Sequence, residues 1–379
     1  AADQEAASGE EAAALGRAGA EGAAPEAPAA SSGGGYVPCF DTLRSTTNDI
    51  VRQAIIPASR RPADLGGGGV ALANVLPRSG EACSAPRMAT HNWNNLFAHL
   101  VAAVVADGLG RRRWDAVGEM LCMHSWKERA KEVQILREEL EARGTLHQSY
   151  WICCFCVNQH ASICHDPAGF RDTVTGEFYP CCTCSQPKFQ NDRPLQCEMN
   201  KFDDMMEYLH RQSPDFLQVV AVDRHFGLFT RAWCIAELVA GYQSDLKQHI
   251  MIESVAALRD HIDHLSSLRV QDCDASREED RRQILGKIGG PEDQDRFNTQ
   301  LRKLVTGEGG LMDSWLDGEH WHREAGHVVA RAMRRVSRGR AAQPAACAEV
   351  VPRPDDAEGA ESPPHQIISA SASAAVVQL

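Results

Sequence analysis

Short apolar runs alternate with longer amphipathic segments through the middle of the chain. The runs with a strand pattern are "RMATH" (87–91), "YWICCFCV" (150–157), "FLQVVAV" (216–222) and "HIMIE" (249–253). Apart from "RMATH", each run is short and mostly apolar, which is typical of a strand buried on both faces of a sheet. We therefore predict that these runs form the strands of one sheet.

Segments with apolar residues at helical spacing separate these strands. They cover residues 95–109, 125–144, 200–212, 230–242, 255–266, 277–288 and 293–305. Gly144 is placed to end one of these helices, and Thr230 is placed to cap another. Strands that alternate with helices predict an α/β fold, in which a parallel sheet carries helices on both faces. In such sheets ligands bind beyond the carboxyl ends of the strands.

The two ends of the chain have a different composition. Residues 1–35 consist mostly of Ala, Glu and Gly, and the tail over 338–379 is rich in Ala, Pro and Ser. Neither segment can bury enough apolar surface to offset the entropy cost of ordering, so we predict that both are disordered. Residues 36–85 contain "GGGG" (66–69) with no strand before it, and we interpret them as a linker with some ordered segments. The folded domain is expected over 86–325.

Net charge and the longest apolar run limit the classes of partner. The chain of 379 residues has a formal net charge of −12, and its basic residues form only short patches. We expect no nucleic-acid partner, because phosphate binding needs clustered Lys and Arg side chains. The longest apolar run, "LVAAVVA" (100–106), is far too short to cross a bilayer, so no membrane span is expected. Since no charged and then apolar leader opens the sequence, we expect a cytoplasmic protein.

Cysteine is concentrated in one part of the chain. Eight of the fourteen Cys residues lie between Cys153 and Cys197, most of them in a Cys-rich insertion over 160–199, and this inventory suits tetrahedral zinc. Strand alternation would point Cys153 and Cys156 to opposite faces, which disfavours them as joint ligands. The zinc ligands that we predict are Cys181, Cys184 and Cys197, with Cys164 or His165. The alternative is that these side chains are small buried residues and free loop thiols.

The stretch "FTRAWCIAEL" (229–238) places a carboxylate in an apolar helix. Trp233 and Glu237 are four positions apart, so they share one face of the predicted helix. This helix follows the strand over 216–222 and therefore starts at the ligand-binding edge of the sheet. Spacing alone favours the common arrangement, in which Glu237 is a surface carboxylate and Trp233 a core aromatic.

Three stretches resemble the Toll/interleukin receptor (TIR) and fungal heterokaryon-incompatibility (HET) domain families. "FTRAWCIAELVAG" looks like the third TIR helix, with its pattern Ser-x-Trp-Cys-x-x-Glu-Leu, and HET domains carry a similar Arg-x-Trp…Glu element. "YWICCFCVNQH" (150–160) resembles the HET signature Trp-Ile-Asp-x-x-Cys-Ile-Asn-Gln. "MATHNWNNLFAHLV" (88–101) looks like the first strand and helix of the group, with a His-x-Trp in the turn. The resemblance covers about 86–270 and implies a TIR-like sheet with flavodoxin-like layering.

The resemblance also implies an activity. In the TIR enzymes that cleave NAD, the Glu of this pattern is the catalytic residue, and it matches Glu237 here. With NAD as substrate, the bond between nicotinamide and ribose would break through an oxocarbenium-like state, whose positive charge a carboxylate can stabilise. The residues expected around the substrate are Trp233, Asn158, Gln159, His91, Trp93 and Arg231. The alternative for Asn158 and Gln159 is that they cap a loop.

Two other classes of function stay open. Many TIR-like domains act by self-association, so this chain could be a non-catalytic interaction module that assembles through its helices. It could also be a zinc-stabilised binding domain in which the Cys-rich insertion is the functional part. Two departures bear on the choice: Cys153 stands where the HET signature has Asp, and the insertion over 160–199 stands where TIR domains have a short loop. An open cleft that Glu237 shares with Asn158 and His91 would favour the enzyme.

Overall fold

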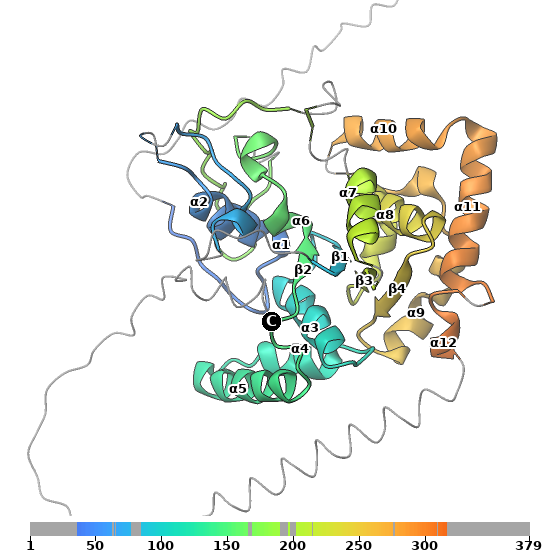
Figure 1. The fold of residues 1–379 in the computed structure, drawn as a ribbon, viewed down its shortest axis with the longest axis horizontal. Coiled ribbons are helices and arrows are strands. Elements are labelled where there is room, and N and C mark those ends of the chain that lie inside the picture. Colours follow the sequence, from blue (N-terminus) through green and yellow to red (C-terminus); the bar gives the residue numbers. More distant parts are fainter. Residues whose placement is uncertain are drawn as a thin grey trace, which may run out of the picture. The chain divides into compact units, whose positions relative to one another are not determined.

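The structure is a computed structural model, and it describes part of the chain (Figure 1). The described residues are 36–316 except 63, 65, 77–84, 166–168, 190–195, 198–201, 214, 276 and 309. The predicted disordered tails over 1–35 and 338–379 lie outside the described residues, as does the end of the expected domain beyond 316.

Four strands form one parallel sheet, as the alternation of strands and helices predicts. The strands are β1 (Arg87–His91), β2 (Tyr150–Ile152), β3 (Leu217–Ala221) and β4 (Lys247–Met251). Their order is β2-β1-β3-β4, and Arg87 lies opposite both Tyr150 and Leu217. This is the strand order of flavodoxin-like sheets, in which the direction of chain progress across the sheet reverses between β1 and β3. Ligands bind at that reversal, beyond the carboxyl ends of the strands.

Helices cover both faces of the sheet, as predicted. Helix α3 (Phe97–Gly108) shares one hydrophobic core with Val219, whereas α8 (Ala232–Gln243) shares a second core with Val220. Successive side chains of a strand point to opposite faces, so α3 and α8 lie on opposite sides of the sheet. Helix α7 (Phe202–Gln212) packs beside α8 (Figure 1).

The other helices of these layers are α4 (Asp115–Leu121), α5 (Trp126–Ala142), α9 (Val255–Ser266), α10 (Glu278–Ile288), α11 (Pro291–Thr306) and the short α12 (Asp313–Leu316). Helix α4 packs on α3 and on α5, whereas α11 contacts α8, α9 and α10 (Figure 1). The predicted end of α5 is confirmed, since Gly144 follows it with a φ of 70° that favours glycine. The predicted cap at Thr230 is wrong, because α8 begins after Arg231 and the Thr230 hydroxyl donates to the carbonyl of Gly227.

The predicted strand over 150–157 ends earlier than its apolar pattern indicates. Only Tyr150–Ile152 pair with β1, and Cys153–Cys156 form the short helix α6. Strand β2 is at the edge of the sheet, so the chain can leave after three paired residues and close a helical turn from Val157 N–H to the Cys153 carbonyl at 3.0 Å. Residues three apart share one face of a helix, so the expectation that Cys153 and Cys156 point apart is also wrong.

The segment before β1 forms ordered structure in its described part. Helices α1 (Thr47–Ile50) and α2 (Ile56–Ala58) are joined by a π-helical turn (Val51–Ile55), and the apolar side chains of all three belong to the α3 core. Asp49 closes a capping box with Thr46. These contacts hold the segment against the sheet layer that carries α3.

Candidate functional site

A cavity of about 370 Å³ lies beyond the carboxyl ends of β1 and β2. His91 ends β1, and Cys153 follows β2, and both line the cavity. Helix α8 supplies Trp233, Cys234 and Glu237 to the lining of the same cavity. The cavity therefore lies at the edge of the sheet where ligands bind in this class of fold.

Glu237 is the cavity carboxyl group whose pKa lies close to neutral. It is half-buried in the second turn of α8, and its Oε2 accepts a hydrogen bond from Thr90 Oγ1 at 2.7 Å. Burial raises the pKa of Glu237 to about 7, and the hydrogen bond from Thr90 opposes this rise. A carboxyl group with a pKa near neutral can give or accept a proton, or act as a carboxylate, at physiological pH.

A chain of hydrogen bonds fixes the Thr90 hydroxyl toward Glu237. Gln248 Nε2 donates to Gln218 Oε1 at 2.8 Å, and Gln218 Nε2 donates to Thr90 Oγ1 at 2.7 Å. The two amide nitrogens also donate to the backbone carbonyls of Leu238 and Glu237 at 2.9 and 3.3 Å. Because a carbonyl can only accept, these contacts set the direction of the chain, and the Thr90 hydroxyl must donate to the Glu237 carboxylate.

His91 presents an acceptor to the cavity. Its side chain is 5% exposed, and Nδ1 lies 3.3 Å from the Ala89 carbonyl, so Nδ1 carries the hydrogen. Burial lowers the pKa of His91 to about 4, so the ring is neutral at pH 7 and Nε2 holds a lone pair. Nε2 is buried with no hydrogen-bond partner among the described residues. An unsatisfied buried acceptor is costly, and its place in the cavity wall suits a hydrogen bond from a water molecule or a polar ligand.

Two thiols of the cavity are held in their neutral form. Trp93 donates its indole N–H to Cys153 Sγ at 3.4 Å, and Cys234 donates its S–H to the His91 carbonyl at 3.4 Å. Burial raises the pKa of Cys153 to about 12, with a further rise from nearby Glu237, and it also raises the pKa of Cys234. Thiols with such values are not nucleophiles at neutral pH. Glu237 is therefore the stronger candidate for the reactive group.

Aromatic rings and guanidinium groups complete the wall. The Trp233 ring meets Phe202 edge-on, with ring centroids 5.8 Å apart, and it also makes a hydrogen bond to Asp280. Burial raises the pKa of Asp280, and the charges of Arg277 and Arg231, which line the same cavity, oppose this rise. Flat aromatic faces beside guanidinium groups suit a ligand that has both a ring and an anionic group.

Most of the residues predicted around the substrate meet in this cavity. The lining includes His91, Trp93, Gln159, Arg231, Trp233 and Glu237. Asn158 is outside the lining, because its amide donates to the Gly69 carbonyl at 3.1 Å and its Oδ1 accepts from His160 N–H at 3.0 Å. Asn158 thus has the loop-capping role that was its alternative interpretation.

Several residues of the candidate site could not be identified from the sequence motifs. Thr90 and Gln218 are polar residues inside strands, and their contact depends on β1 lying beside β3. Arg277 and Asp280 come from the region of α10, about forty residues after Glu237 in the sequence. Sequence spacing cannot place such residues together without the order of the strands.

A second group of chemistry-bearing side chains lies in the Cys-rich segment. His160, Cys164, Cys182 and Cys184 bring one ligand atom each within 4.8 Å of one another, so this His-Cys group could hold a metal such as zinc. The sulfurs of Cys164 and Cys184 are 3.5 Å apart, and Cys182 Sγ lies 3.7 Å from His160 Nδ1. The group is the one cluster of potential metal ligands in the described part of the chain.

The composition of the His-Cys group differs from the predicted zinc ligands. Cys164 and Cys184 are common to both sets. Cys181 is exposed, Cys197 is buried apart from the group, and His165 is exposed. Burial raises the pKa of the Cys184 thiol, but hydrogen bonds from the Gln186 backbone, His160, Cys164 and Lys188 outweigh it and lower that pKa to about 6.

Among the described helices, none has the length and apolar character needed to cross a membrane. A scan against protein-family models, a search of curated proteins and a search of solved structures each found no match. Inference about function therefore depends on the residues and the geometry of the chain itself.

Proposed function

We propose that the chain is a TIR/HET-like signalling domain that cleaves NAD between nicotinamide and ribose, with Glu237 as the catalytic carboxylate. The observation that carries this proposal is the half-buried Glu237 side chain, which lines a cavity at the carboxyl edge of the sheet and has its pKa raised to about 7. The pattern of Trp233, Cys234 and Glu237, which resembles the TIR helix, supports the same assignment.

The chemistry of NAD matches what a single carboxylate can do. The bond from the ribose carbon to the nicotinamide nitrogen breaks, and its electron pair leaves with nicotinamide, which becomes neutral. Because this leaving group needs no proton, the site needs no strong general acid. The carboxylate of Glu237 stabilises the positive charge that develops on the ribose. A water molecule then forms the new carbon–oxygen bond, and its proton passes to Glu237 or to solvent.

The other groups of the cavity suit the remaining parts of NAD. Trp93 and Trp233 offer flat faces for a nicotinamide ring. Arg231 and Arg277 provide charge complementary to a pyrophosphate. The lone pair of His91 Nε2 can accept a hydrogen bond from an amide or a ribose hydroxyl. A volume of about 370 Å³ is within the range of small-molecule sites.

Product analysis tests the proposal. The full chain is incubated with NAD at high protein concentration, and nicotinamide and ADP-ribose products are separated by chromatography. We expect nicotinamide and an ADP-ribose product in equal amounts. If no nicotinamide appears under these conditions, the proposed activity is wrong.

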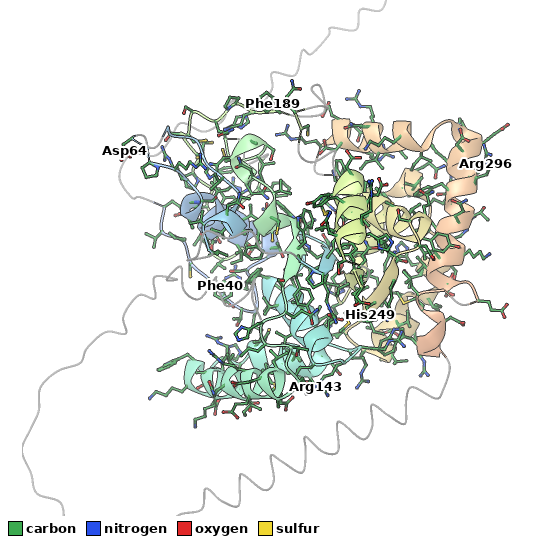
Figure 2. The ribbon with its side chains drawn as sticks, viewed as in Figure 1. Phe40, Asp64, Arg143, Phe189, His249 and Arg296 are labelled. Atoms are coloured by element: carbon green, nitrogen blue, oxygen red, sulfur yellow. The ribbon has the colours of Figure 1, made fainter. Side chains whose placement is uncertain are left out.

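Self-association is a second candidate function, and an exposed apolar stripe on α5 favours it. Trp126 is 59% exposed and Val133 is 44% exposed, and residues seven apart share one face of a helix. Helix α5 ends at the C-cap Arg143, which is labelled in Figure 2. Such apolar positions on one helix face are typical of a contact with another chain.

Light scattering on the full chain tests this second function. We expect oligomers that Trp126→Glu shifts toward monomer, whereas a monomeric wild-type chain would exclude self-association.

A further inference from the structure

We propose that His160, Cys164, Cys182 and Cys184 bind one zinc ion, which fastens the Cys-rich segment to the wall of the cavity. This inference does not depend on the proposed NAD cleavage. It is carried by the geometry of the four ligand atoms, by the partners of the histidine ring and by the charge beside the thiols.

The spacing of the four ligand atoms is that of a tetrahedral site. With Zn–S of about 2.3 Å and Zn–N of about 2.0–2.1 Å, a regular tetrahedron places two sulfurs about 3.8 Å apart and a sulfur and a nitrogen about 3.6 Å apart. The observed separations are 3.5 Å for Cys164 Sγ to Cys184 Sγ and 3.7 Å for Cys182 Sγ to His160 Nδ1. All four atoms lie within 4.8 Å of one another, so small side-chain adjustments bring them into coordination distance.

The ring of His160 is held in the form that a metal needs. Its Nε2 lies 2.9 Å from the Ile56 carbonyl and 3.2 Å from Ser59 Oγ, and the side chain is fully buried. A carbonyl can only accept, so Nε2 carries the hydrogen and Nδ1 keeps a lone pair directed toward Cys182. Metal-binding histidines usually have such a carbonyl or carboxylate on the second ring nitrogen, which sets the tautomer and the ring orientation.

Lys188 balances the charge of the site. Three thiolates and a neutral imidazole around Zn²⁺ leave one negative charge, because the three thiol protons are released on binding. Lys188 Nζ lies 3.3 Å from Cys184 Sγ and is held there by the carbonyls of His160 and Gln186, each at 2.8 Å. One ammonium group therefore neutralises the complex in a partly buried position.

The backbone close to the group leaves little room for a different arrangement. A Cβ on Gly69 would lie 2.1 Å from the Cδ2 atom of His160, so only glycine lets the backbone at this position pack on the ring. The backbone N–H of Cys182 donates to the Cys164 carbonyl at 2.9 Å, and that of Phe189 (labelled in Figure 2) donates to the Ala161 carbonyl at 2.9 Å. The ligands are thus placed by contacts that do not require the metal.

Zinc at this position would fix one wall of the cavity. Gln159, Ser162 and Ile163 line the cavity, and they are close neighbours in sequence of the proposed ligands His160 and Cys164. A zinc ion would therefore join the segment that carries these lining residues to the segment around Cys182 and Cys184.

Metal analysis of the purified full chain tests the proposal. We expect about one zinc ion per chain after expression with added zinc, and a loss of at least about tenfold in bound zinc for Cys164→Ser and for Cys182→Ser. The matched control is Cys181→Ser, which removes a neighbouring exposed thiol and should leave the zinc content unchanged. Zinc near zero in the wild type, or an equal loss in Cys181→Ser and Cys182→Ser, would overturn the proposal.

A second measurement does not depend on the folding of the variants. Zinc is removed from the wild-type chain with a chelator, and Co²⁺ alone is added under reducing conditions. We expect the intense visible absorption of tetrahedral cobalt bound by thiolates, with saturation at about one ion per chain. If the group instead forms a disulfide between Cys164 and Cys184, whose sulfurs must then approach to about 2.05 Å, thiol titration without reductant counts two thiols fewer. If the reduced group does not bind metal, no cobalt band develops. Either outcome contradicts the proposal.

Discussion

Burial sets the acidity of individual residues in the cavity more than neighbouring charge does. It raises the pKa of Glu237 to about 7 and that of Cys153 to about 12, and it lowers the pKa of His91 to about 4. At neutral pH the thiol and the imidazole are therefore uncharged, and Glu237 alone of these three titrates near pH 7. This difference is why Cys153 and His91 are better suited to contact a ligand of the cavity than to act as nucleophile or base.

The raised pKa of Glu237 predicts a pH-dependent cost to stability. Below its ordinary value of 4.5 the carboxyl is protonated in the folded and the unfolded chain. Between 4.5 and about 7 the unfolded chain releases this proton while the folded chain keeps it, so the free energy of unfolding falls as pH rises, and above about 7 the loss is complete. Glu237→Gln cannot ionise and should gain about 1–3 kcal/mol relative to the wild type between these limits.

Urea unfolding near the two ends of this pH range measures the effect. The control is Glu141→Gln, which changes an exposed carboxylate on α5 and should give no pH-dependent difference. A stability difference between Glu237→Gln and the wild type that stays the same at both ends of the range would show that the carboxyl is not protonated by burial.

The hydrogen bond from Thr90 predicts a second pH effect. This bond favours the carboxylate form and lowers the pKa of Glu237, so Thr90→Val should move the pKa further above 7. Valine matches threonine in shape, so packing in β1 is largely kept. The inflection in the pH profile of nicotinamide release, or the carboxyl titration followed by NMR, should move to higher pH. Thr299→Val, on the exposed side of α11, should leave it unchanged, and an unmoved inflection in Thr90→Val would exclude the role of Thr90.

At the level of elements, periodicity located most strands and helices, but not the turn after β2. The apolar pattern over 150–157 continues past Ile152, yet the chain leaves the sheet there because β2 has a partner on one side only. The pattern of Trp233 and Glu237 marked a helix that lines the cavity, since residues four apart share a face whatever the tertiary structure. Thr90 and Gln218 could not be assigned to the site, because their contact follows from strand order, which periodicity does not determine.

The glycine run at 66–69 shows the same limit for the Cys-rich segment. Its composition indicates a linker, but Gly66, Gly67 and Gly68 adopt positive φ values and Gly69 packs on the His160 ring. The pairing of His160 with Cys182 and Cys184 likewise arises from these tertiary contacts, whereas sequence spacing favoured Cys181 and Cys197.

The close approach of Gly69 to His160 predicts a specific sensitivity. In Gly69→Ala the new methyl group would overlap the ring, so the ring or the backbone must move. We expect a loss of about 1–3 kcal/mol in the free energy of unfolding and weaker zinc binding. Gly286→Ala, on α10 with open space around its Cβ, is the control and should be neutral or slightly stabilising. Equal stability of the two variants would show that Gly69 is not packed as described.

At the level of the whole molecule, the cavity and the His-Cys group share one stretch of backbone. Residues 159–164 supply cavity lining from one set of positions and members of the His-Cys group from the other. The two sites should therefore be coupled, since a change at the metal alters the position of the wall. Thr90 and Gln218 bond to each other and to Glu237 and are not members of the His-Cys group, so we expect this hydrogen-bond network to stay unchanged.

Metal removal tests this coupling. Chelation of zinc should speed proteolysis or amide exchange in the segment over 159–189, because a structural metal site contributes directly to folding free energy. Exchange in α8 should stay slow, since its buried apolar side chains belong to a different core from that of Cys164. Re-addition of zinc should restore protection. An equal loss of protection in α8 would indicate that the metal holds the whole fold and not one wall.

The role of Glu237 is tested most directly by the rate of nicotinamide release from NAD in Glu237→Gln and in the exposed control Glu141→Gln. Both changes remove one carboxylate, but only Glu237 lines the cavity. We predict that Glu141→Gln retains the wild-type rate and that Glu237→Gln loses at least about a hundredfold, since its amide cannot stabilise the developing charge on the ribose. A Glu237→Gln chain that is folded and releases nicotinamide at the wild-type rate would contradict the account.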